Sequence, residues 1–293
     1  MRRLFCILLA LLMIVGLTTS ALANVAVGEQ RVVLGADLNA EQREQMLRDF
    51  GLLPGVVPEL TVTIQEERAH LQGVVPDSVI GSRSISSIYI ITAPAGTGLD
   101  ITINNINWLT EAIYRNALIT AGITDARVII SAPVPVSGTA ALTGIYKAFE
   151  DITGEELSEE AKRISIEEAV LTGNLAEALG DDENITALIN ELKLILDETQ
   201  HMTDDQVRTE IRNLAVEHNI SLTDTQVEQI LRLVRSLEGL DIGALRGAVE
   251  AVIGNLDRIM EISQGVGGFF SSVGDFFAGI GRSISNFFSN LFG

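Results

Sequence analysis

The sequence predicts an α+β fold: a mixed sheet with about three helices, then an all-α helical domain and a C-terminal amphipathic helix. All six prolines lie between Pro54 and Pro135. Runs rich in β-branched residues alternate with helical patterns before residue 153, and every segment beyond Gly154 has helical periodicity. We therefore predict a mixed domain over 24–153, a helical bundle over 154–264 and a Phe-rich tail over 265–293.

The first 23 residues have the pattern of a secretory signal peptide. Two arginines precede an apolar run over residues 4–17, and small residues follow at Ala21 and Ala23. The run is shorter than the roughly 20 apolar residues that span a bilayer, which argues against an uncleaved anchor. We expect cleavage between Ala23 and Asn24 and a secreted or surface-associated protein.

The mixed half should contain several strands and about three helices. We expect strands over 31–34, 60–64, 85–91, 99–103 and 126–131. The first helix should begin at Asn39, with Gln42 completing a capping box, and end before Gly51. The second should run from near Asn107 to Gly122, and the third over 138–153.

The helical half carries one apolar stripe per helix, as in residues 185–196, which indicates a bundle. The motif that begins at Thr203 recurs at Thr223, and we interpret it as capping chemistry used twice. The acidic cluster over 181–184 lacks the ligand spacing of a calcium loop, so we interpret it as a helix cap, with weak calcium binding as the alternative. A longer helix should run over 241–262.

Composition and motifs exclude several functions. The formal net charge of −19 and the scattered arginines exclude nucleic-acid binding. The only cysteine, Cys6, lies in the signal peptide, so the mature chain has no disulfide or thiol nucleophile. The isolated histidines, His70, His201 and His218, predict no metal site. No nucleotide-binding fingerprint or serine elbow is present, so we predict no cofactor and name no catalytic residue.

Two loops are candidate ligand contacts. Ser137, Gly138 and Thr139 follow a strand and precede a helix, whose N-terminus favours an anion. The ordinary interpretation is that Ser137 or Thr139 caps this helix. Arg83, which follows Ser82 at a strand entry, is either an anion clamp or a surface charge.

Three long stretches carry a family resemblance: 76–90 (PDSVIGSRSISSIYI), 105–123 (NINWLTEAIYRNALITAGI) and 132–150 (APVPVSGTAALTGIYKAFE). They resemble the YpuA-like family of secreted proteins of unknown function from Gram-positive bacteria. The similarity covers the signal peptide, the mixed half and much of the helical half. The resemblance implies export and a shared architecture. The family has no established reaction, so no site residue is carried over.

The tail holds seven of the ten phenylalanines, and its bulky apolar residues share one helical face. We expect contact with a membrane surface or an envelope protein through Phe269, Phe270, Val273, Phe276, Phe277, Ile280, Ile284, Phe287, Phe288, Leu291 and Phe292. The alternative is docking of this face on the protein's own helical half or on a second copy.

The sequence therefore favours a non-enzymatic binding or structural protein that its tail tethers to the envelope. The alternative is a secreted enzyme or ligand-binding sensor that uses the two loops. That alternative requires a polar pocket that joins Ser82 and Arg83 to Ser137 and Thr139.

Overall fold

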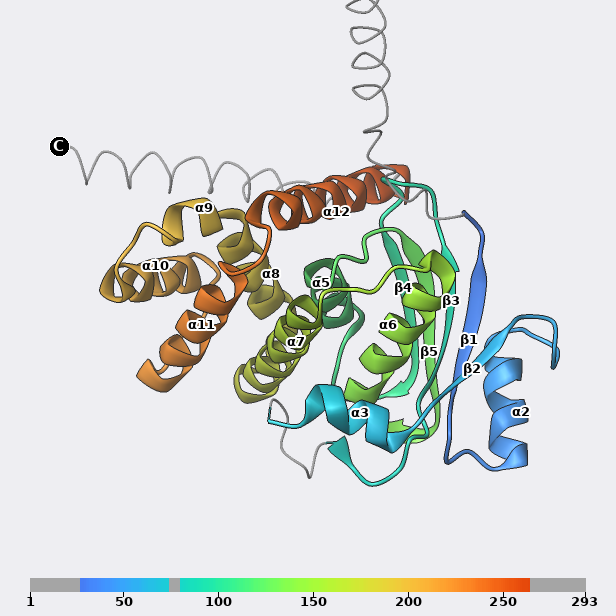
Figure 1. Ribbon diagram of the computed structural model, residues 1–293. Coiled ribbons are helices and arrows are strands. Elements are labelled where there is room, and N and C mark those ends of the chain that lie inside the picture. Colours follow the sequence, from blue (N-terminus) through green and yellow to red (C-terminus); the bar gives the residue numbers. More distant parts are fainter. Residues whose placement is uncertain (1–26, 74–79, 264–293) are drawn as a thin grey trace, which may run out of the picture.

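The computed structural model describes residues 27–73 and 80–263, with side chains described as far as residue 252. Five strands in this part of the chain form one sheet (Figure 1): β1 (Gln30–Gly35), β2 (Glu59–Val62), β3 (Ser87–Thr92), β4 (Leu99–Ile106) and β5 (Ala126–Val136). Their order is β2-β1-β3-β5-β4. The pairs β1–β2 and β4–β5 are parallel, whereas β3 is antiparallel to both of its neighbours. The predicted mixed sheet is confirmed.

Helices cover both faces of the sheet because its strands bury alternate residues on opposite sides. Val32, Leu34 and Tyr89 pack in one cluster with α2 (Ala40–Asp49). Val33 and Ile88 belong to the core on the other side, where α5 (Glu111–Thr120) and α6 (Thr139–Thr153) lie. A short helix, α3 (Ile64–Leu71), packs against α6.

The second half is helical, as predicted. Its elements are α7 (Glu159–Leu179), α8 (Asp182–Leu194), α9 (Leu196–Thr199), α10 (Asp204–Glu217), α11 (Asp224–Leu237) and α12 (Ile242–Ser263). α7 packs along α5, and α12 lies across α8 and α5 (Figure 1). One continuous apolar core joins sheet residues such as Val33 to helical residues as far as Val252. The domain boundary at residue 153 stays a prediction.

The capping motifs are confirmed. Asn39 and Gln42 form a capping box at the start of α2. Asp181 accepts a hydrogen bond from the backbone N–H of Asn184, so the acidic cluster caps α8. Thr203 and Thr223 begin α10 and α11 with the same box. Local chemistry therefore fixes where these four helices begin.

Several element boundaries differ from the prediction by two residues or more; β3 begins at Ser87 and β4 ends at Ile106. The second strand ends at Val62, because Thr63 caps α3 instead of continuing the strand. The second helix begins at Glu111, with Thr110 as its cap. β5 runs on to Val136 through two prolines, beyond the end of its pairing with β3 at Ser131. Proline is tolerated where one side of a strand has no partner.

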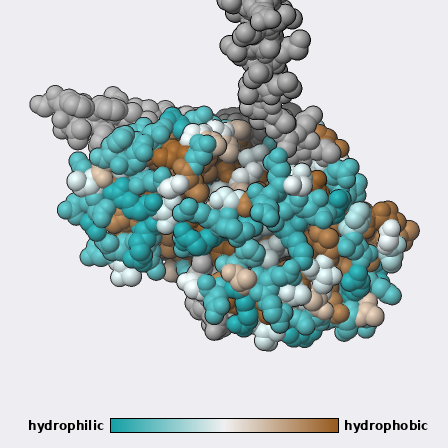
Figure 2. Space-filling model, in the orientation of Figure 1, coloured by the Kyte–Doolittle hydropathy of each residue, from teal (hydrophilic) through white to brown (hydrophobic). Residues whose placement is uncertain are grey.

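The face in Figure 2 is mostly hydrophilic, with hydrophobic residues scattered among polar ones. Leu53 and Val56, on the loop before β2, are 73% and 66% exposed. Within residues 27–73 and 80–263, no helix combines the length and the hydropathy needed to cross a bilayer. The predicted signal peptide, including Ala21, Ala23 and Asn24, and the Phe-rich tail lie outside the described residues.

Candidate functional site

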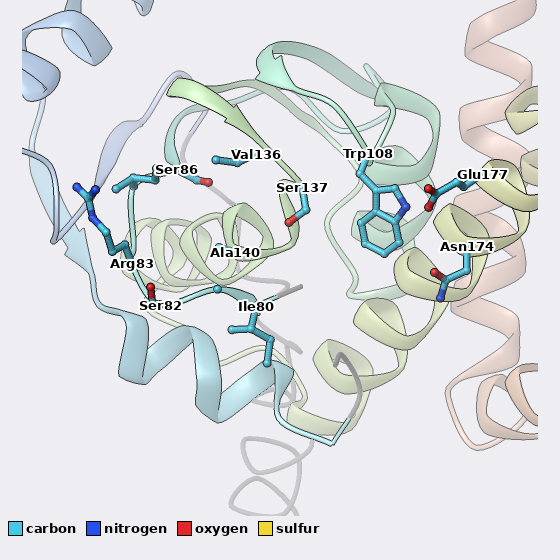
Figure 3. Close-up of a pocket in the computed structure, with 13 residues that line it drawn as sticks. Ile80, Ser82, Arg83, Ser86, Trp108, Val136, Ser137, Ala140, Asn174 and Glu177 are labelled. Atoms are coloured by element: carbon cyan, nitrogen blue, oxygen red, sulfur yellow. The ribbon is translucent and has the colours of Figure 1, made fainter. Parts of the chain in front are cut away.

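A cavity of about 490 Å³ lies beside the end of β5, between the segment that enters β3, the turn into α6, and α7 (Figure 3). This volume lies within the usual range of small-molecule sites. The cavity is lined by Ile80, Gly81, Ser82, Arg83, Ile85, Ser86, Trp108, Val136, Ser137, Gly138, Ala140, Asn174 and Glu177. The structure thus brings the two loops proposed from the sequence into one cavity. Thr139 is not part of the lining, and its side chain is buried.

The turn into α6 is held in place by Gly138 and Tyr114. Gly138 has φ = 95°, a left-handed conformation that favours glycine. The hydroxyl of the fully buried Tyr114 donates a hydrogen bond of 2.6 Å to the Gly138 carbonyl. A Cβ at residue 138 would lie 2.3 Å from that hydroxyl oxygen. The turn therefore requires glycine both for its backbone conformation and for space.

The expectation that Ser137 or Thr139 would be the cap of α6 is wrong, because neither of them is its N-cap residue. The N-cap residue is Gly138. The Ser137 and Thr139 hydroxyls lie 3.5 Å from each other. The backbone N–H of Ala141 donates a hydrogen bond to the Gly138 carbonyl. The glycine that the turn requires has no side chain with which to cap. The positive end of the helix dipole therefore opens next to the cavity.

Two polar groups in the cavity wall have no hydrogen-bond partner among the described residues. Ser86 is only 5% exposed, and its hydroxyl lies next to the cavity. The Nε1–H of Trp108 is buried and unpaired. For the indole N–H, burial without a partner costs about 1–3 kcal/mol. The Ser86 hydroxyl carries no such cost, because it is not one of the buried unpaired atoms and can be reached from the cavity.

The opposite wall comes from one face of α7 and from Trp108. Gly173 allows the indole to lie close to the helix, because a Cβ there would be 3.1 Å from two ring carbons. Asn174 and Glu177, one turn apart on α7, extend this wall with an amide and a carboxylate. In Figure 3, they lie beside the indole and on the opposite side of the cavity from Ser82 and Arg83.

Arg83 lines the cavity, but its guanidinium points away from the cavity interior (Figure 3). The guanidinium donates a hydrogen bond of 3.1 Å to the carbonyl of Asp37. The Asp37 carboxylate accepts a hydrogen bond of 2.7 Å from the backbone N–H of Ser84. This arrangement fixes the loop, so Arg83 holds the wall in place and does not clamp an anion inside it.

The lining lacks the groups of a hydrolase centre. It contains three serines, yet no histidine among the described residues lies on it. Within the same residues, no group of three histidine, cysteine, aspartate or glutamate side chains is placed to hold a metal ion. The lining offers hydroxyl and amide groups, one carboxylate, an aromatic ring and a helix dipole. These groups can form hydrogen bonds and apolar contacts with a ligand.

Among the polar and aromatic lining residues, the sequence analysis missed Ser86, Trp108, Asn174 and Glu177. The first two lie at the start of a strand and of a helix that were predicted, but nothing in their spacing shows which way their side chains point. The pair on α7 has an (i, i+3) spacing, which is common on any solvated helix. The α7 residues reach the cavity only because α7 packs along α5, a contact that sequence patterns do not specify.

The fold and cavity define a class: an α+β protein with a polar, aromatic-walled cavity where its sheet meets its helical half. The chain belongs to a protein family of unknown function, DUF1002, whose model matches residues 34–252. It is 35% identical over 272 residues to the uncharacterized protein YpuA of Bacillus subtilis (strain 168), with 92% of each chain covered. No solved structure matches significantly. The resemblance to YpuA-like proteins is confirmed.

Proposed function

We propose that this is an exported binding protein that takes a small ligand into the cavity between Ser86, the start of α6 and α7. The observation that carries the proposal is the start of α6, where Gly138 provides no side-chain cap, beside Ser86, a residue that is only 5% exposed and lines the cavity. A ligand with hydrogen-bonding groups would pair both sites at once. The absence of a histidine from the described lining favours binding over the alternative of a secreted enzyme.

A cavity-filling variant tests this proposal. A metabolite library would be screened against the mature chain, residues 24–293, by thermal shift. We expect at least one compound to raise the melting temperature of the native protein and to lose that effect in Ala140→Phe, since Ala140 lines the cavity. Ala178→Phe is the matched control, because Ala178 is exposed on α7 and lies outside the lining.

Two results would contradict the cavity as the binding site. One is a library without any stabilising compound for the native protein. The other is a set of compounds that stabilise the native protein and Ala140→Phe equally. Circular dichroism of both phenylalanine variants would establish that they fold before the comparison is made.

We also propose that the tail over 265–293 tethers the protein to a membrane surface or an envelope partner. The support is the sequence pattern: seven phenylalanines share one helical face, and only Asp275 and Arg282 are charged. Each buried phenylalanine contributes roughly 1.5–3 kcal/mol, so a few of them suffice for measurable membrane binding. Such a tether would keep an exported binding protein near its source of ligand.

Liposome co-sedimentation tests the tether. Residues 24–293 would be compared with residues 24–264, using neutral and anionic vesicles at low and high salt. We expect only the longer form to pellet, with little dependence on salt or lipid charge, because the tail is nearly neutral. Equal behaviour of the two forms would contradict a membrane tether and would favour docking of the tail on its own protein or on a second copy.

A further inference from the structure

The two ends of the cavity differ in charge preference. At one end, the uncapped start of α6 and the Ser86 hydroxyl favour a group that accepts hydrogen bonds and carries negative charge. At the other end, α7 presents the carboxylate of Glu177 and the amide of Asn174 (Figure 3). Arg83 does not neutralise Glu177, since its guanidinium is bound to Asp37 on the far side.

The wall between these ends is apolar. Trp108, Ile80, Val136 and Ala140 all line the cavity, and the indole is packed against Gly173. A ligand that bridges the two ends must therefore present a hydrophobic body to the indole and hold its polar groups apart.

We infer that the cavity binds a zwitterionic amino compound, an amino acid or short peptide with an apolar side chain. Its carboxylate accepts hydrogen bonds at the start of α6 and from Ser86, its protonated amine donates to Glu177, and its side chain lies against Trp108. This inference rests on the proposed binding function and specifies its ligand class.

Simpler ligand classes fit the cavity less well. A phosphate or dicarboxylate would bring a second negative charge toward Glu177 in a protein of net charge −19. A simple amine would leave the helix start and Ser86 unpaired. An uncharged sugar could stack on Trp108, but it would use neither the helix dipole nor the carboxylate charge. The zwitterion alone pairs both ends.

Isothermal titration of the mature chain with three matched probes tests the inference. The probes are L-leucine, 4-methylpentanoate, which lacks the amine, and 3-methylbutylamine, which lacks the carboxylate. We expect leucine, or leucyl-leucine if the site takes a dipeptide, to bind about tenfold or more tightly than either analogue. A hydrogen bond to a charged group accounts for a difference of that size.

Two variants assign the ends of the ligand. Glu177→Gln should weaken leucine about tenfold and leave 4-methylpentanoate unchanged or tighter. Ser86→Ala should weaken leucine and 4-methylpentanoate but not 3-methylbutylamine. Glu41→Gln is the control, since Glu41 is exposed on α2, which covers the opposite face of the sheet. Unfolding curves would show whether each variant is folded.

The outcomes separate this inference from the proposed function. If 4-methylpentanoate binds as tightly as leucine, or if Glu177→Gln weakens all probes equally, the zwitterion assignment is overturned. The zwitterion assignment is also overturned if none of these probes binds but another library compound stabilises the protein through the cavity. In that case the proposed binding function still stands. If no compound of any class binds, both proposals fail.

Discussion

Glu67 is fully buried on α3, and its partner Ser84 has only one proton to donate. The Ser84 hydroxyl lies 2.8 Å from the Val62 carbonyl and also contacts a Glu67 carboxyl oxygen. It can donate to only one of them, so both contacts are satisfied when Glu67 is protonated and donates to Ser84. Burial raises the pKa of Glu67 to about 7, which Asp37 and Glu66 reinforce by repulsion.

Glu67 therefore makes stability fall as pH rises. Between its ordinary pKa and about 7, the folded state holds a proton that the unfolded state has released. The stabilisation present at lower pH is lost as pH rises through this window, by an amount on the order of 3 kcal/mol. In Glu67→Gln, we expect this contribution to be absent, so the variant gains stability relative to the native protein as pH rises from 5 to 8.

Urea unfolding at both pH values measures the difference between the two proteins. Glu41→Gln, a change at an exposed carboxylate, should follow the native protein closely. Parallel pH dependences of native protein and Glu67→Gln would contradict the account. Burial of Glu67 could not be predicted from sequence patterns, because residues 64–71 are largely polar and are typical of a solvated surface.

At the scale of elements, the repeated capping box explains how α10 and α11 begin. Each threonine hydroxyl accepts from the backbone N–H of the glutamine three residues later, and each glutamine side chain accepts from the threonine N–H at 2.8 Å. Both threonines start a helix with buried apolar residues, among them Val207 and Val227.

Thr203→Ala and Thr223→Ala should each lower the free energy of unfolding by about 1 kcal/mol, because each removes a cap. Thr209→Ala is the control, because it makes the same substitution inside a helix instead of at its cap. Thr209 is exposed inside α10, where alanine is the better helix former, so this change should be neutral or slightly stabilising. Equal effects at all three positions, measured by chemical denaturation, would show that the capping boxes do not matter.

Most elements could be predicted because their signals are local. The missed helix α3 also had a local signal, since Thr63 and Glu66 have the capping-box spacing, but the β-branched residues before it favoured a longer strand. The extension of β5 beyond Ser131 had no local signal in the sequence. Its prolines argue against a strand unless one side is unpaired, and the end of the pairing with β3 is a tertiary fact.

At the scale of the whole molecule, a buried ion pair of the helical half is hydrogen-bonded to α5 of the sheet half. The Nζ atom of Lys193 on α8 lies 2.5 Å from Oε1 of Glu168 on α7, and both side chains are buried. Lys193 also donates to the Asn116 carbonyl on α5 at 3.1 Å, and Glu168 accepts from Thr120 at 2.6 Å. Neither charge is identifiable from the sequence, because only the packing of three helices brings them together.

Removing one partner should cost far more than replacing both. Lys193→Met leaves the buried Glu168 without its cation, so the folded state must hold either an unpaired charge or a carboxyl protonated against its ordinary pKa, and we expect a loss of about 3–5 kcal/mol. The double variant Glu168→Gln with Lys193→Met should recover most of that loss, since glutamine still accepts from Thr120. Guanidinium unfolding measures both. A double variant as unstable as the single one would show that size and shape matter here more than charge.

Because the core is continuous across residue 153, both halves should unfold in one transition. The sheet half buries one side of α5 against α7 and α8, so its core is incomplete without the helical half. Two separate transitions, followed by the fluorescence of Trp108 and by far-ultraviolet circular dichroism, would favour the predicted division into two independent domains.

We propose the cavity beside α6 as a ligand site. Trp108 lines this cavity and is the chain's only tryptophan, so its indole signal can be assigned without ambiguity and should respond to a ligand there. We would record its single indole N–H resonance in ¹⁵N-labelled mature protein while adding leucine and the compounds that stabilise the protein. We expect the indole resonance to shift saturably with ligand concentration in the native protein and not to shift in Ala140→Phe. A compound that stabilises the protein while this resonance stays unchanged would contradict it.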